Sequence, residues 1–197
     1  MANTRENLVH TAMQLFAEKG YHSTSIADIL TTAGVNSGSL YHFFPGKQDL
    51  LVAVLDAYLQ GIQEMLLKPA WQGVKDPVER VFSLLSTYRE LLVSSDFFYG
   101  CPIGNLALEL HEPDPAVREK LEANFTAWRD AVAGCIREAA VEKRVSLDAD
   151  ALATMVLAVM EGGVMLSRTY RDVSLHDVTV VELRNLFERA GLQGVTR

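Results

Sequence analysis

The sequence predicts an all-α fold of about nine helices. An aspartate followed by a proline occurs at Asp76-Pro77 and Asp114-Pro115, and this pair is typical of a capped helix start with proline at the first helical position. The apolar residues after the second pair recur at helical spacing, at Val117, Leu121, Phe125, Trp128, Val132, Ile136 and Ala139. No segment keeps the two-residue alternation of a half-buried strand, so we expect no sheet.

The first two helices have clear boundaries. The first covers residues 4–19 and is ended by Gly20. Ser25 and Asp28 form a capping-box pattern that begins a second helix. Gly34 ends that helix, because glycine adopts a positive φ most easily.

A short polar helix follows. Asn36 or Ser37 can cap it, and it runs only to about Phe43, because Pro45 disfavours helix at the residue before it. A helix of two turns is unstable alone in water, so it must pack against neighbours. We expect the inward contacts to come from Val35, Leu40 and Phe44. The remaining positions are small or polar and suit contact with phosphates and base edges, as in a helix-turn-helix that binds DNA.

The rest of the chain divides into further helices at its proline, glycine and capping residues. We expect helices over residues 46–67, 77–94, 102–110, 115–143, 148–171 and 174–191, with a loop over 71–75. Ser174 and Asp177 suggest a capping box for the last of them.

Composition limits the class of protein. The net charge is −7 and hydrophobic residues make up 49% of the chain, which is normal for a soluble globular protein. The polar N-terminus carries no signal-peptide pattern. The apolar run over 149–166 is interrupted by polar residues and glycines, so it predicts a buried helix rather than a membrane span. Two cysteines fit a reducing cytoplasm, where we expect the protein to reside.

Residues 4 to about 60 resemble the DNA-binding domain of TetR-type transcriptional regulators. The matching segments, in order, are Leu15 to Tyr21, Thr24 to Ile26, Ala33 to Val35, Gly38 to Phe44, Lys47, and Leu50-Leu51. The resemblance implies a three-helix DNA-binding domain over 1–48 and a ligand-binding and dimerisation domain over 49–197, with the helix over 46–67 linking them.

The resemblance also implies the DNA contacts. Asn36 to His42 would form the recognition helix in the major groove, and Tyr41 and Lys47 would contact phosphates. The implied DNA-binding set is Thr24, Ser25, Asn36, Ser37, Gly38, Ser39, Tyr41, His42 and Lys47. Taken alone, Tyr41 could instead be a packing aromatic and Lys47 a solvated surface charge.

The charge of this segment limits how it can bind DNA. Residues 1–50 carry three basic side chains, Arg5, Lys19 and Lys47, against four acidic ones. This is not the basic footprint of a general nucleic-acid-binding protein. We therefore expect modest non-specific affinity with a shallow salt dependence, and binding that relies on sequence-specific fit to a palindromic double-stranded operator.

The last two helices, over about 148–190, predict a homodimer. Residues 151–166 are apolar nearly all round and include Gly162-Gly163, which would allow a close helix–helix approach. The alternative is ordinary burial within one subunit. The resemblance implies that these helices pair with those of a second subunit as a four-helix bundle.

The body also predicts a small-molecule site. The candidate ligand contacts are Phe98, Cys101, Asn105, Glu109, Phe125, Trp128, Met155 and Glu161. Large apolar residues of this kind are more often core than pocket. Asn105 and Glu109 lie four apart and could instead bond to each other or to the backbone. Glu161 is equally consistent with structural pairing.

Cys101 precedes a helix, where the helix dipole favours a thiolate. It is therefore a candidate electrophile or redox sensor, or alternatively a small buried residue. A catalytic pair with His111 is excluded, because ten residues of helix separate the two by about 15 Å. No metal-ligand or cofactor motif is present in the sequence. We expect a non-enzymatic regulator, most simply a repressor released by a small molecule. A helical adaptor, or a sensor acting through Cys101, is the alternative.

Overall fold

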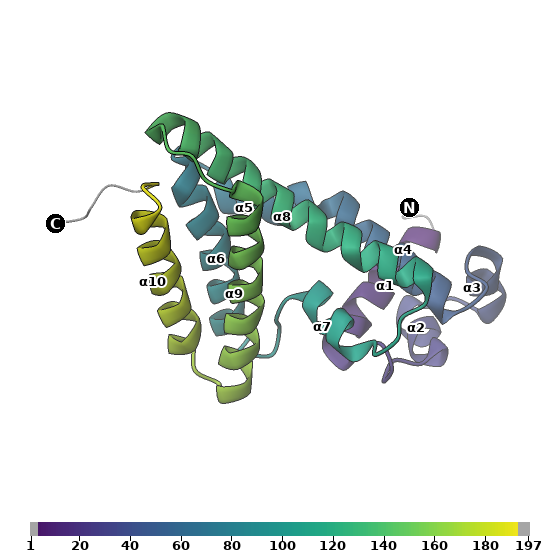
Figure 1. Ribbon diagram of the computed structural model, residues 1–197. Helices are drawn as coiled ribbons and strands as arrows, with labels where there is room; N and C mark the ends of the chain where they lie inside the picture. The colour runs from purple at the N-terminus through teal and green to yellow at the C-terminus, as the bar shows by residue number, and fades with distance from the viewer. Residues whose placement is uncertain (1–3, 193–197) are drawn as a thin grey trace. The chain divides into compact units, whose positions relative to one another are not determined.

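The computed structural model describes residues 4–192, and all regular structure in that range is helical (Figure 1). The elements are α1 Thr4–Lys19, α2 Ile26–Ala33, α3 Ser37–Phe43, α4 Lys47–Ile62, the π-helical turn η1 Gln63–Leu67, α5 Lys68–Trp71, α6 Pro77–Ser94, α7 Pro102–Glu109, α8 Pro115–Lys143, α9 Ala149–Tyr170 and α10 Ser174–Arg189. Because α4, η1 and α5 form one continuous helical stretch, nine helices make up the described part of the chain. The all-α prediction is confirmed. The ends of the two expected domains, residues 1–3 and 193–197, lie outside the described residues.

These residues form two compact units. The first contains the described residues up to Gly61 together with Pro102–Phe125, and the second contains Ile62–Cys101 together with the described residues from Thr126 onward. Helix α8 therefore contributes its first turns to one unit and the remainder to the other. Packing in the first unit reaches past residue 48, because α4, α7 and the start of α8 share its core.

The core of the first unit is a cluster of apolar side chains from α1, α2, α3, α4, α7 and α8. Its fully buried members include Leu8, Ile29, Leu40 and Leu50, and each such side chain stabilises the fold by roughly 1.5–3 kcal/mol. Two asparagine side chains link helices of this unit by donating hydrogen bonds to backbone carbonyls of a neighbouring helix. Asn7 Nδ2 donates to the Ala33 carbonyl at 2.9 Å, and Asn124 Nδ2 donates to the Leu55 carbonyl at 3.0 Å.

The helix boundaries near the N-terminus confirm the predictions from capping residues. Ser25 and Asp28 form both bonds of the capping box at the start of α2. Gly34 ends α2 with φ +67°. Asn36 caps α3 by accepting the Ser39 N–H at 2.9 Å. These boundaries depend on contacts only three or four residues apart, so the local sequence was enough to locate them.

The prediction that the fourth helix ends before Pro69 is wrong. The chain stays helical to Trp71, so the expected loop begins at Gln72. Proline has no N–H and its ring crowds the carbonyl of residue i−4. The wider π-helical turn directly before Pro69, in which Lys68 N–H bonds to the Gln63 carbonyl, lets the helix continue past it.

The predicted capping box at the start of α10 is also wrong. The Ser174 N–H is accepted by Asp172 Oδ1 at 2.9 Å. Asp177 is instead bound by Arg89, whose Nε donates to Oδ1 at 2.6 Å. The arginine on α6 offers a charged partner that the local sequence does not reveal.

In the second unit, α9 and α10 pack as an antiparallel pair beside α6 (Figure 1). The Phe82 and Phe187 rings meet edge to face at 5.2 Å, and Arg184 lies over Phe82 at 3.9 Å. Gly163 allows α10 to approach α9 closely, because a Cβ there would lie 2.9 Å from Thr179 Oγ1. Gly162 faces open space. The close approach expected of this glycine pair thus occurs within one subunit at Gly163.

Two helical stretches, Lys47–Trp71 and Ala149–Tyr170, are long and apolar enough to span a bilayer by length and composition alone. Core helices of soluble proteins share these properties. In α9 only 33% of the most apolar window is buried within this chain, so the buried helix expected there leaves much of its apolar surface uncovered by its own subunit.

His176 on α10 is a buried histidine whose two ring nitrogens have no hydrogen-bond partner. The residue is 1% exposed, and its backbone N–H donates to Ser167 Oγ at 3.0 Å. Burial lowers the pKa of the imidazole below its ordinary value, the Asp177 carboxylate opposes this shift, and Arg89 adds to it. The folded protein therefore holds His176 neutral.

We predict that this histidine makes the fold less stable in mild acid. The unfolded chain binds a proton near pH 6.5, but the folded chain does so only at lower pH. The free energy of unfolding therefore keeps the full contribution of neutral His176 above pH 6.5. This contribution is lost as the pH falls through the folded pKa. His176→Leu should remove this pH-dependent contribution. The Tm of the variant, relative to that of wild type, should therefore be higher at pH 5.5 than at pH 7.5. His10→Leu, at an exposed site, is the control. Equal pH slopes for His176→Leu and wild type would contradict the prediction.

Candidate nucleic-acid interface

Helix α3 presents a polar face to solvent because Leu40, on its opposite face, is buried in the core. Leu40 is fully buried, and Phe44, at the C-cap, is nearly so. Asn36, Ser37, Gly38 and His42 are exposed, and Ser39 is partly exposed. The interior contacts expected of Leu40 and Phe44 are confirmed. Val35 packs against the same core as a partly buried residue.

The Asn36 side chain fixes the first turn of α3. Its Oδ1 accepts both the N–H and the hydroxyl of Ser39, at 2.9 and 3.1 Å. A Cβ at Gly38 would lie 3.3 Å from the same oxygen. The amide group of Asn36 and the Ser37 hydroxyl stay at the surface, where hydrogen bonds to base edges or phosphates are feasible.

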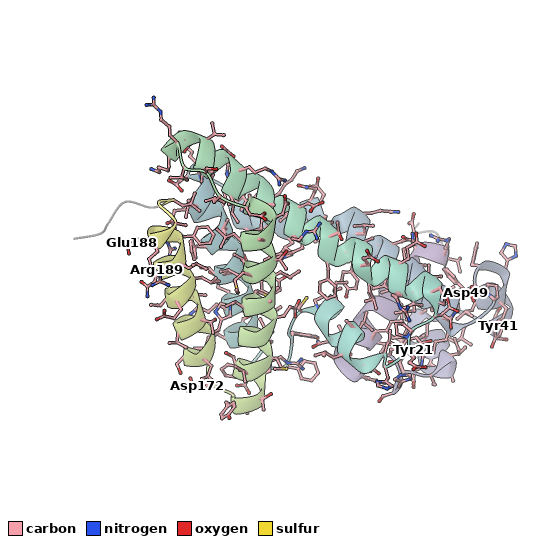
Figure 2. All side chains as sticks on the ribbon, in the orientation of Figure 1. Tyr21, Tyr41, Asp49, Asp172, Glu188 and Arg189 are labelled. Carbon is pink, nitrogen blue, oxygen red and sulfur yellow. The ribbon has the colours of Figure 1, made fainter. Side chains whose placement is uncertain are left out.

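Tyr41 projects from α3 with 55% of its surface exposed (Figure 2). Such exposure argues against the alternative of a packing aromatic. Next to it, the His42 ring meets Phe43 edge to face at 4.7 Å. The exposed tyrosine hydroxyl can donate to a phosphate oxygen without contributing a charge.

Lys47, the first residue of α4, rests on an aromatic ring. Its ammonium lies 4.2 Å from the centre of the Tyr21 ring, within the range of a cation–π contact. Partial burial lowers the pKa of Lys47, and the Glu109 carboxylate opposes that shift. The lysine is therefore held in one place and is not a freely solvated charge.

Thr24, a member of the predicted DNA-binding set, uses its side chain inside the protein. Its side chain is 0% exposed, and its hydroxyl donates to the carbonyls of Gly20 and Leu15 at 2.7 and 3.2 Å. The threonine thus closes the turn between α1 and α2. Ser25, the next residue, is exposed and caps α2, so it stays in the candidate set.

The sequence did not single out Tyr21 as a site residue, and it left the partners of Glu109 open. Oε2 of Glu109 accepts the Tyr21 N–H at 2.8 Å, and Oε1 accepts the His22 N–H at 2.6 Å. Both carboxylate oxygens are therefore occupied by backbone groups, which was one of the alternatives left open for this residue. The only local signal was Gly20, whose left-handed conformation exposes these N–H groups.

Three of the predicted ligand residues meet in the second unit, together with Tyr88. The Tyr88 hydroxyl bonds to the Cys101 thiol, which in turn bonds to the Glu161 carboxyl. The Trp128 indole lies beside Tyr88, although its Nε1 makes no well-formed hydrogen bond. Oε1 of Glu161 also has no partner. We call Tyr88, Cys101, Trp128 and Glu161 the buried polar cluster.

Burial raises the pKa of both acids in this cluster. The pKa of Glu161 is raised by desolvation, and the bond from Cys101 reduces the shift. The pKa of Tyr88 is raised well above its ordinary value by desolvation first and then by Cys101 and Glu161. Both groups thus favour their neutral, hydrogen-bond-donating forms.

The remaining predicted ligand residues do not join this cluster. Phe98 and Met155 are each about half exposed, at 51% and 50%. Asn105, Glu109 and Phe125 belong to the first unit.

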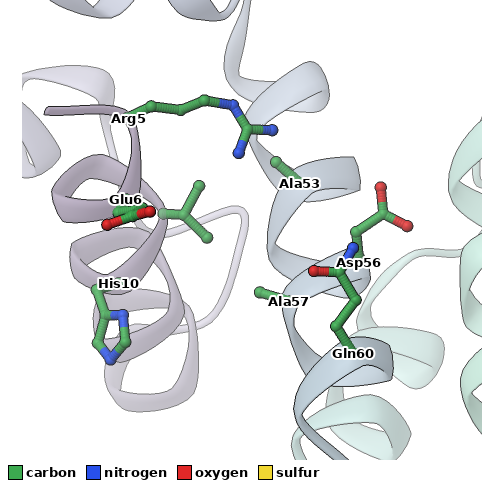
Figure 3. Close-up of a pocket in the computed structure, with 8 residues that line it drawn as sticks. Arg5, Glu6, His10, Ala53, Asp56, Ala57 and Gln60 are labelled. Atoms are coloured by element: carbon green, nitrogen blue, oxygen red, sulfur yellow. The ribbon is translucent and has the colours of Figure 1, made fainter. Parts of the chain in front are cut away.

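A polar groove lies between α1 and α4 (Figure 3). Its volume is about 260 Å³, and its lining is Arg5, Glu6, Val9, His10, Ala53, Asp56, Ala57 and Gln60. Asp56 is paired with Lys120 at 2.8 Å. Charges of both signs line the groove, so its electrostatics select no single class of ligand.

A second groove, between α9 and α10, is mainly apolar. It has a volume of about 330 Å³ and is lined by Met155, Val159, Val178, Thr179, Glu182, Leu183, Leu186 and Arg189. Further exposed apolar side chains on these two helices are Met165, Leu166, Tyr170 and Val181. We call these exposed residues and the groove the α9–α10 face.

Comparison with known proteins identifies the family. Residues 8–54 match bacterial regulatory proteins of the tetR family, and residues 77–179 match the C-terminal domain of LmrA/YxaF-like transcriptional regulators. The HTH-type transcriptional regulator YxaF of Bacillus subtilis is 32% identical over 171 residues, which cover 86% of this chain and 87% of YxaF. The HTH-type transcriptional repressor DhaR of Mycobacterium sp. is 28% identical over 176 residues, covering 87% of each chain.

The crystal structure of a TetR regulatory protein from Rhodobacter sphaeroides superposes with a TM-score of 0.81 at 27% identity, covering 91% of this chain and 96% of that one. The fold, the sequence similarity and the exposed polar face of α3 thus all indicate the same family. The chain belongs to the TetR family of bacterial transcriptional regulators, which bind DNA and are not enzymes.

Proposed function

We propose that this protein is a dimeric, ligand-responsive repressor that binds a palindromic operator and is released by a small molecule. The observation that carries the proposal is the exposed polar face of α3, anchored by buried Leu40 in a TetR-family DNA-binding domain. The repressor role is supported by the name of DhaR. As a soluble DNA-binding regulator, the protein would act in the cytoplasm.

The DNA contacts rely mainly on neutral donors. The proposed set is Ser25, Asn36, Ser37, Gly38, Ser39, Tyr41, His42 and Lys47. Hydroxyl and backbone N–H groups would position the protein on phosphates, and the side chains of α3 would contact base edges. The N-terminus of α2 adds its helix dipole at Ser25. This arrangement suits a domain that has little net positive charge.

The α9–α10 face supports the dimer. Val178 and Met155 are half exposed on either side of an apolar groove, and an uncovered apolar surface of this kind marks an interaction site. A second copy of α9 and α10 would cover it, which also explains why the apolar helix α9 is only partly buried in one chain. A two-fold dimer would then place two α3 helices on the half-sites of a palindrome.

The buried polar cluster supports a ligand site. Trp128 Nε1 is a buried donor with no well-formed hydrogen bond beyond its contact with Tyr88, and Glu161 Oε1 is a buried oxygen without a partner. Unsatisfied buried polar groups are costly. A small ligand with one hydrogen-bond acceptor and one donor would satisfy both. A ligand that binds more tightly to the dimer state that does not bind the operator would then shift the population toward that state. Helix α4, which links the two parts of the chain, would transmit the change.

A redox or electrophile sensor acting through Cys101 is less well supported. Sensor thiols are accessible to their oxidants, whereas Cys101 is 6% exposed and bonded to Tyr88 and Glu161. The thiol is therefore better explained as part of the ligand-contacting cluster.

We predict that Tyr41→Phe and Lys47→Ala weaken operator binding without affecting the fold. Removing the hydroxyl should cost about 0.5–1.5 kcal/mol per protomer, and removing the ammonium should also reduce the salt slope by about 1 per protomer. Fluorescence anisotropy over a salt series measures both. Lys75→Ala, an exposed lysine in the second unit, is the matched control. If Lys47→Ala binds like this control, the proposed phosphate contact is absent.

We predict that Val178→Glu converts a dimer into a monomer. A carboxylate buried in an apolar interface is strongly unfavourable. Light scattering after size-exclusion chromatography should give a dimer for wild type and a monomer for the variant. Val141→Glu, at an exposed position on α8, should stay dimeric. A dimeric Val178→Glu would place the interface elsewhere.

We predict that inducing compounds act through Trp128 and Glu161. In a Trp71→Phe background Trp128 is the sole tryptophan, so its fluorescence reports directly on the cluster. A compound that releases the operator should change this fluorescence, and Glu161→Gln should weaken its binding at least several-fold. Glu188→Gln on α10 serves as the control. Inducers that bind Glu161→Gln as tightly as wild type, with no change in Trp128 emission, would rule out this site.

A further inference from the structure

Glu109 connects α7 to the part of the DNA-binding unit that faces phosphate. Its two carboxylate oxygens accept consecutive backbone N–H groups of the α1–α2 turn, from Tyr21 at 2.8 Å and His22 at 2.6 Å. Glu109 is the last residue of α7. It lies more than 80 residues away in the chain from the turn that it binds and outside the matched N-terminal domain of residues 8–54.

The turn is shaped to receive this carboxylate. Gly20 has φ +84°, and a Cβ at this position would lie 3.0 Å from Glu109 Oε2. Successive N–H groups that converge after a left-handed residue form a concave site for an anion. Charge-assisted hydrogen bonds of this type are stronger than those between neutral groups. Glu109 therefore holds the turn in one conformation.

The same turn supports two candidate DNA contacts, Lys47 on α4 and Ser25 at the start of α2. The Tyr21 ring packs edge to face on Phe16 at 5.2 Å and supports the Lys47 ammonium at 4.2 Å. Three residues further on, the Thr24 N–H bonds to the Tyr21 carbonyl at 3.3 Å, immediately before Ser25 begins α2. Displacing Tyr21 would therefore shift both the ammonium and the N-terminus of α2.

We infer that Glu109 is a positioning residue for DNA binding, which holds Tyr21 so that Lys47 and the α2 N-terminus meet the phosphate backbone. The inference rests on the proposed DNA contacts. It makes α7 a functional part of the DNA-binding unit, although α7 lies outside the helix-turn-helix. The chain runs from Cys101 of the buried polar cluster directly into α7, so this helix is also covalently joined to the proposed ligand site.

The electrostatics of this region provide a readout that is independent of DNA. The charge of Glu109 raises the pKa of Lys47 against the effect of burial, and it raises the pKa of Tyr21 together with desolvation and Asp49. Loss of the Glu109 charge should therefore lower the pKa of Lys47. This pKa therefore reports whether the carboxylate lies close enough to act on the lysine in the folded protein.

The test compares full-length wild type, Glu109→Gln and Glu112→Gln. The glutamine at 109 keeps the shape but removes the charge and one acceptor oxygen, and Glu112 is an exposed control three residues away. The DNA probe is the duplex that wild type selects from a randomised pool. We expect Glu109→Gln to bind it about tenfold more weakly, the effect of losing a hydrogen bond to a charged group, while Glu112→Gln binds as wild type does.

The second measurement is the titration of ¹³C-methylated Lys47 by NMR, assigned with Lys47→Arg. A downward shift of its pKa in Glu109→Gln, with circular dichroism and dimer mass unchanged, shows that the Glu109 charge acts at Lys47 in the folded protein, and together with the weaker duplex binding it supports positioning. Wild-type affinity in Glu109→Gln, or an unshifted Lys47, overturns the inference. If wild type selects no duplex, the proposed operator binding fails, and with it the role of Glu109 in DNA binding, whereas a shifted Lys47 pKa would still show that Glu109 acts on the lysine.

Discussion

The arrangement of the DNA-binding unit depends on the burial of one side chain, Leu40. Helix α3 has seven residues, too few to be stable in water. Its helical conformation therefore comes from packing Leu40, with Phe44 at its end, into the core shared by α1 and α4. With Phe43 also packing against this core, the remaining positions of α3 are free to face solvent, so folding and DNA contact depend on different residues.

The protein carries a net charge of −7, but several carboxylates of the first unit are already bound to donors of that unit. Asp28 caps α2, Glu109 binds the α1–α2 turn, and Asp56 pairs with Lys120. Each of these carboxylates is bound to a donor within its own unit. The helix α3 itself carries no acidic residue, so the proposed recognition surface adds no negative charge of its own.

Among the described residues, the second unit buries unsatisfied polar atoms at two places that bear on its packing. One is the buried polar cluster around Cys101, and the other is the imidazole of His176 between α9 and α10. Burying such groups costs stability that an apolar core would retain. Their presence in an otherwise apolar body, beside helices that also form the α9–α10 face, is consistent with a body whose packing can be shifted by a ligand.

The sequence by itself determined the helix boundaries that depend on near neighbours. The Ser25–Asp28 box, the Gly34 stop and the Asn36 cap all rest on bonds across three or four residues. It also determined the family, because the motif is contiguous. Only the tertiary structure decided that Thr24 is buried, that Asp177 binds Arg89, and that Glu109 binds the Tyr21 turn. These contacts join residues up to 88 positions apart, and the choice of partner for a buried hydroxyl or carboxylate depends on which donors the folded chain brings within reach.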